Sequence, residues 1–115
     1  MRLPEPPAMW IFLNDAFLSV VADKHDPSGR RLLVRACREG DIERVFPAAE
    51  VAMTADADYR FRAWLSRERV AAVLKQQVEA LAYTNFKSSI RDRAYHDAAM
   101  GAWSVMHRYQ SEQAA

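Results

Sequence analysis

The stretch from Asp56 to Lys87 changes its hydrophobic period once, and this change limits what the chain can fold into. Over residues 59–65 the side chains alternate between an apolar side (Tyr59, Phe61, Ala63 and Leu65) and a second side (Arg60, Arg62 and Trp64). A period of two with one apolar side predicts a strand whose sheet is wetted on its other face. After Ser66 apolar residues recur at helical spacing, at Val70, Val73, Leu74, Val78 and Leu81. This second pattern predicts an amphipathic helix over residues 67–81 that packs back on the sheet.

The N-terminal part of the chain predicts three further strands. Residues 9–13 and 16–21 are apolar runs joined by Asn14 and Asp15, which tolerate the positive φ that tight hairpin turns require. Residues 23–29 form a polar loop that contains Pro27 and Gly29. Residues 31–38 alternate again and predict a third strand. Its inward side is Leu32, Val34 and Ala36, and its other side is Leu33, Arg35 and Cys37.

The C-terminal part adds helices. After Gly40 a short helix is expected, with Asp41 as its N-cap, an apolar edge of Ile42, Val45 and Phe46, and Pro47 limiting its length. Residues 50–54 predict another strand, and residues 83–87 end the long helix because Thr and Asn compete for backbone hydrogen bonds. A last helix over residues 90–109 is expected to open with Ser89 and Asp92 as a capping box.

This order of elements predicts the α+β class. We expect an antiparallel sheet of three to five strands, with two longer helices and one short helix packed on one face. Residues 9–110 are predicted to form a single domain, because 115 residues suffice for one core but not for two. Residues 1–8 are predicted to be a disordered tail and residues 111–115 a frayed one.

The net charge and the number of cysteines limit which binding partners and which cellular compartment are expected for this protein. The net charge of +1 excludes the strong basic field that many nucleic-acid-binding proteins carry. One cysteine, Cys37, cannot form an internal disulfide, so a cytoplasmic location is expected. The sequence has no apolar run of the roughly 18 residues that would span a bilayer, so we expect no membrane partner.

Several motifs carry a resemblance to a known family. They are residues 10–12 with 17–21, residues 58–63, residues 83–87, the pair Tyr95 and His96, and Trp103. Over about residues 9–110 the chain resembles a family of small bacterial proteins of unassigned function. The resemblance implies a compact cytoplasmic protein without cofactors, and it implies no activity and no functional residues.

The residues that could carry chemistry do not form a recognisable catalytic set, so we predict no catalytic residue, no metal and no cofactor. His96 and His107 share a helix face but lie about 16 Å apart at about 1.5 Å per residue, too far to bind one metal ion. Cys37 could be a nucleophile only beside a histidine, and a lone cysteine on a strand is more often a small buried hydrophobic residue. Asp56 and Asp58 are typical of a turn.

One sheet face is the candidate site for a partner. Arg60, Arg62 and Trp64 share a strand face, and Arg35 is expected on a neighbouring strand. Arginine beside an indole can hold an anion, stack on a base or anchor a protein. The alternative is that the last helix or the first hairpin covers Trp64. A second candidate site is a stripe on the last helix, His96, Met100, Trp103 and His107, although a Met-Trp stripe at helical spacing is more often core.

These observations favour a small non-enzymatic accessory protein of bacterial or prophage origin that binds another protein. An inhibitor of a host defence system, such as an anti-CRISPR, is one form of this hypothesis. The alternative is a nucleic-acid-binding module that uses the face of Arg35, Arg60, Arg62 and Trp64. A small enzyme of unknown reaction comes third. Oligomeric state stays open.

Overall fold

A computed structural model describes the chain from residue 9 to residue 114, with side chains described through residue 113. The chain divides into two compact units, residues 1–82 and residues 83–115. The first contains the sheet and two helices, and the second contains the two remaining helices. The α+β class is confirmed.

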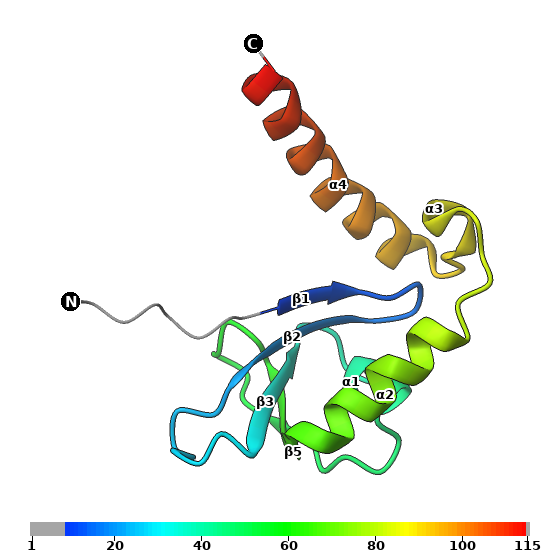
Figure 1. Ribbon diagram of the computed structural model, residues 1–115. Coiled ribbons are helices and arrows are strands. Elements are labelled where there is room, and N and C mark those ends of the chain that lie inside the picture. The colour runs from blue at the N-terminus through cyan, green and yellow to red at the C-terminus, as the bar shows by residue number, and fades with distance from the viewer. Residues whose placement is uncertain (1–8, 115) are drawn as a thin grey trace. The chain divides into compact units, whose positions relative to one another are not determined.

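The sheet of the first unit has five strands, and every neighbouring pair is antiparallel. The strands are β1 (Met9–Phe12), β2 (Phe17–Ala22), β3 (Arg31–Ala36), β4 (Ala52–Met53) and β5 (Phe61–Ser66). Their order in the sheet is β1-β2-β3-β5-β4, so the long strands β2, β3 and β5 lie at its centre (Figure 1). The hairpin of β1 and β2 is confirmed, and the amide of Leu13 donates to the carbonyl of Ala16. The sequence left the type of this turn open, and neither Asn14 nor Asp15 adopts positive φ in it.

The core lies on one face of this sheet. It combines strand residues such as Leu18, Val34 and Leu65 with residues of α1 (Asp41–Val45) and α2 (Arg67–Glu79). The helical contribution is Ile42, Val45 and Val70, and Phe46, the C-cap of α1, is buried with them. At the start of α2 the Ser66 hydroxyl accepts the amide of Arg69 at 3.1 Å, which caps the helix as the strand ends.

The apolar stripe of α2 reaches the core only in its first half. Val70 is buried and Val73 and Leu74 pack against the core cluster, as predicted. Val78 is 72% exposed, and Leu81 is 56% exposed and lies beyond the end of the helix. Their prediction as core residues is therefore wrong, since helical spacing does not show how far a helix stays against its sheet.

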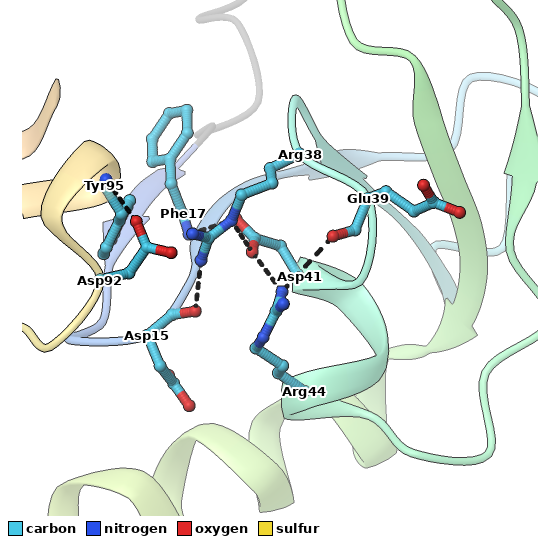
Figure 2. Close-up of polar contacts among 8 residues, drawn as sticks. All are labelled: Asp15, Phe17, Arg38, Glu39, Asp41, Arg44, Asp92 and Tyr95. Atoms are coloured by element: carbon cyan, nitrogen blue, oxygen red, sulfur yellow. Dashed lines mark hydrogen bonds and ion pairs between the residues drawn. The ribbon is translucent and has the colours of Figure 1, made fainter.

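Asp41 forms a buried polar centre where the start of β2 meets α1 (Figure 2). Its carboxylate accepts the Phe17 amide at 3.0 Å, Arg38 Nε at 2.7 Å and Arg44 Nη1 at 2.7 Å. The residue before it, Gly40, is the N-cap and takes a φ of 91°, a conformation that favours glycine. The predicted role of Asp41 as N-cap is therefore wrong, and its carboxylate instead ties two elements together.

The second unit contains α3 (Phe86–Ser89) and α4 (Arg93–Ala114). α3 was not predicted, because four residues show no period. The expected capping box is also wrong: Ser89 donates to the carbonyl of Phe86, and Asp92 alone caps α4 by accepting the Tyr95 amide at 2.8 Å (Figure 2). α4 continues past Tyr109 through residue 114, so the helix does not end where the sequence suggested. The predicted tail of residues 1–8 lies outside the described residues.

Candidate functional site

The sheet face opposite the core is the open sheet face, because both helices of the first unit pack on the other side. Strand pairing defines its members, since directly paired residues on neighbouring strands point to the same side. One row across four strands joins Trp10, Ser19, Arg35 and Arg62. A second row joins Val21, Leu33 and Trp64. The predicted grouping of Arg35, Arg62 and Trp64 on one face is therefore confirmed.

Tyr59 folds over this face and organises it. The guanidinium carbon of Arg35 lies 4.4 Å from the centroid of the Tyr59 ring, within the range of a cation–π interaction. The Tyr59 hydroxyl accepts the indole N–H of Trp10 at 2.9 Å. Arg35 Nη2 donates to the Ser19 hydroxyl at 2.9 Å. Tyr59 was predicted on the core side, and that prediction is wrong because a bend over residues 57–60 precedes β5 and ends the alternation.

Arg62 is held by the same loop. Its Nη2 donates to the Asp58 carboxylate at 3.1 Å, and its Nε donates to the Tyr59 carbonyl at 3.4 Å. Arg62 also pairs directly with Arg35 across β3 and β5. Two like charges at such a pair would repel, and the Asp58 carboxylate offsets that repulsion. Arg35 and Arg62 are therefore engaged within the protein rather than extended toward solvent.

Arg60 and Trp64 are the predicted site residues that remain available. Arg60 precedes β5, is exposed, and its backbone carbonyl accepts the amide of Thr54. Trp64 is 43% exposed. Trp10 at the edge of the sheet is 70% exposed. The open sheet face thus presents two exposed indoles, and the exposed Arg60 lies in the bend just before β5.

Aromatic rings extend the face along the first hairpin. Phe17 stacks on Phe12 at a centroid distance of 4.5 Å, and it meets Trp10 edge-to-face at 5.8 Å. The sequence reasoning missed Trp10 and Tyr59 as site residues. Trp10 could have been found by carrying the alternation through the hairpin turn. The turn pairs Trp10 with Ser19, and Ser19 in turn pairs with Arg35, so all three lie on the same face. No sequence signal indicated that Tyr59 would leave the core side.

The thiol of Cys37 is not a prepared nucleophile. Burial, followed by the negative charges of Asp41 and Asp58, raises the pKa of Cys37, so the thiol stays protonated at neutral pH. The residue itself is exposed, which contradicts the expectation of a small buried side chain. Within residues 9–113, no group of three histidine, cysteine or acidic side chains could hold a metal ion.

The stripe on α4 is not core at its C-terminal end. His96 and Met100 are half-buried, whereas Trp103 is exposed and stacks on the His107 ring at 4.8 Å. The expectation that the whole stripe is core is therefore wrong. The small residues Ala94, Ala98 and Gly101 of the same helix are exposed as well.

No family model, no curated protein and no solved structure matches this chain. The resemblance to a family of small bacterial proteins therefore stays a hypothesis. Among the described helices, none is both long enough and apolar enough to cross a membrane.

Proposed function

We propose that this chain is a non-enzymatic accessory protein that binds another protein through its open sheet face, with Trp10 and Trp64 as anchors. The observation that supports this most is the exposure of two indoles, 70% for Trp10 and 43% for Trp64, on a face that the helices of its unit leave open. Tryptophan and arginine are enriched at the energetic centres of protein interfaces. Arg60 beside this face supplies a charge for the rim.

The contacts of Tyr59 support a prepared binding surface. The Trp10 indole is fixed by its hydrogen bond to Tyr59, and Tyr59 is fixed by its contact with Arg35. A side chain that is already ordered loses little rotamer freedom on binding, which otherwise costs about 0.5–1.5 kcal/mol per side chain. The cluster therefore favours binding of a partner without rearrangement of the face.

Nucleic acid is the second candidate, and one observation favours it: exposed aromatic rings on a sheet beside an arginine can stack on bases. Affinity for a phosphate backbone, however, requires several available cations. Arg62 is paired with Asp58, Arg35 lies under Tyr59, and the net charge is only +1. These contacts favour a protein partner. Binding to a short single strand that weakens steeply with salt would support the second candidate instead.

The same proposal includes the origin of the protein, its biological role and its cellular location. An origin in a bacterium or prophage and a role against a host defence system, such as that of an anti-CRISPR, agree with 115 residues and a single binding face. A cytoplasmic location agrees with the single cysteine.

The experiment compares capture of partners from the native host by three tagged proteins. The wild type should retain a specific protein in amounts that Trp10→Ala with Trp64→Ala reduces strongly. Trp103→Ala is the matched control, because Trp103 is an exposed indole of the other unit. All three proteins should melt cooperatively. Equal capture by the wild type and the double variant would contradict the proposal.

A further inference from the structure

Strand β1 forms one edge of the sheet. It pairs with β2, and among the described residues no strand pairs with its other side. An edge strand presents a row of backbone amide and carbonyl groups that a further strand can bind. The free edge of β1 is therefore a binding surface of a different kind from the open sheet face, because it offers backbone rather than side chains.

The hairpin turn determines which backbone groups of β1 point outward. The Leu13 amide donates to the Ala16 carbonyl at 2.8 Å, so this pair is a hydrogen-bonded one. In an antiparallel ladder, hydrogen-bonded and non-hydrogen-bonded pairs alternate along the strand. Ile11 therefore bonds to β2, whereas Trp10 and Phe12 occupy non-hydrogen-bonded positions. The amide and carbonyl groups of Trp10 and Phe12 point away from β2, toward the free edge.

β1 has none of the features that usually keep an edge strand from pairing. Natural proteins protect such edges with lysine, proline, bulges or very short strands. The four residues of β1 are Met9, Trp10, Ile11 and Phe12, so the strand contains no charge and no proline, and all four pair with β2 without a bulge. The opposite edge, β4, is protected because it is only two residues long. Of the two edges, β1 is thus the one that can accept a further strand.

The side chains of β1 indicate what kind of segment fits beside it. Trp10 and Phe12 lie on the open sheet face and are 70% and 36% exposed. Ile11 lies on the other face and packs against the core cluster. The side chains of an added strand alternate between these two faces and lie beside these residues. An extended segment with apolar residues on both of its faces therefore fits this edge.

We propose that an extended segment of the partner protein adds to β1 as a sixth strand of the sheet. The partner is the one of the proposed function, on which this inference rests, since a strand beside β1 also contacts Trp10. The outward groups of Trp10 and Phe12 recur at about 6.7 Å, two residues of a strand. Another extended backbone has the same repeat, whereas the backbone groups within a helix are already bonded to one another. Main-chain hydrogen bonds supply affinity in this mode of binding, and side-chain contacts supply specificity.

Backbone N-methylation tests this proposal in the full chain. Cys37 is the only cysteine, so a synthetic segment of residues 1–36 can be ligated to residues 37–115 without changing any residue. N-methylation of Phe12 removes an outward donor and places a methyl group where the added strand would lie. It should leave the melting temperature unchanged and weaken binding of the captured partner by more than about tenfold. N-methylation of Ile11 is the matched control, because it removes a donor to β2 and should lower the melting temperature.

Amide hydrogen exchange gives a second readout, which decides the question if N-methylation of Phe12 itself lowers the melting temperature. The amides of Trp10 and Phe12 should exchange quickly in the free protein and become protected in the complex. Unchanged exchange of both amides would overturn strand addition. If Trp10→Ala with Trp64→Ala still reduced capture in that case, the proposed function would stand without it. Absence of any captured partner would overturn both.

Discussion

The guanidinium carbon of Arg35 lies 4.4 Å from the centroid of the Tyr59 ring, on the sheet face away from the core. This contact joins the central strand β3 to the loop that leads into β5, and the Tyr59 hydroxyl extends it to Trp10 on the edge strand β1. The candidate site is therefore a connected set of side chains rather than a row of independent arginines.

Tyr59 should contribute to stability through two separable contacts. Tyr59→Phe removes the hydroxyl that accepts the Trp10 indole, and an exposed hydrogen bond of this kind contributes about 0.5–1.5 kcal/mol. Tyr59→Ala also removes the ring over Arg35, at a further cost of about 0.5–2 kcal/mol. Urea unfolding of the two variants measures both steps. Equal stability of the alanine and phenylalanine variants would show that the ring contact contributes nothing.

Asp41 should be the most costly polar residue to replace. Its carboxylate is buried and accepts from Phe17, Arg38 and Arg44. Asp41→Ala leaves the Phe17 amide without its acceptor and removes one acceptor each from Arg38 and Arg44, which is expected to destabilise the fold by about 1–3 kcal/mol. Thermal unfolding measures this, with Asp15→Ala as a control, because Asp15 is exposed and Arg38 bonds to its backbone carbonyl. If Asp41→Ala lowered the stability no more than Asp15→Ala does, the Asp41 carboxylate would have no structural role.

Acid should destabilise the loop between β2 and β3 through two aspartates. The His25 amide, followed by Arg31, lowers the pKa of Asp23, and the Ser28 hydroxyl, followed by the Arg31 amide, lowers the pKa of Asp26. A lowered folded-state pKa means that the unfolded chain binds protons first as pH falls. The stabilisation is therefore complete above the ordinary value of 3.8 and is lost as pH falls through the lowered values.

Urea unfolding between about pH 6 and pH 2 measures that dependence. Asp23→Asn with Asp26→Asn should flatten the acid limb of the stability curve relative to the wild type. An acid limb of unchanged steepness in the double variant would place the protonation elsewhere.

Cys37 should react slowly with thiol reagents although it is exposed. Because its pKa is raised, the thiolate fraction at pH 7 is smaller than in an unstructured peptide. Alkylation followed by mass spectrometry should therefore be slower than for a reference peptide and should accelerate as pH rises. Cys37→Ala should leave partner capture intact. A rate at pH 7 above that of the peptide would revive the nucleophile hypothesis.

Local periodicity predicted the sheet well. Alternation alone placed Leu32, Val34, Ala63 and Leu65 in the core, because a strand has only two sides and one of them is apolar. It failed at Tyr59, two residues before the start of β5, since a period carries no information about where a strand bends. The pairing of Trp10 with Ser19 follows from the two-residue turn at Asn14 and Asp15, and carrying that register across the hairpin would have extended the open sheet face to Trp10.

Helical periodicity was less informative. It found Val70 in the core but not the exposure of Val78, because the stripe of a helix continues where its packing partner ends. The cap of α4 is Asp92 rather than Ser89, because Ser89 is the last residue of the short helix α3, which the sequence did not predict. The contacts that hold Arg35 and Arg62 depend on the conformation of the loop before β5. Residue spacing in the sequence does not predict that conformation.

Hydroxyl-radical footprinting of the three tryptophans tests the central claim most directly. The captured partner is added to the protein, and oxidation of each indole is measured by mass spectrometry in the free and bound states. If the partner binds at the open sheet face, Trp10 and Trp64 become protected while Trp103 keeps its rate of oxidation. Protection of Trp103 with Trp10 and Trp64 unchanged would contradict binding at the open sheet face.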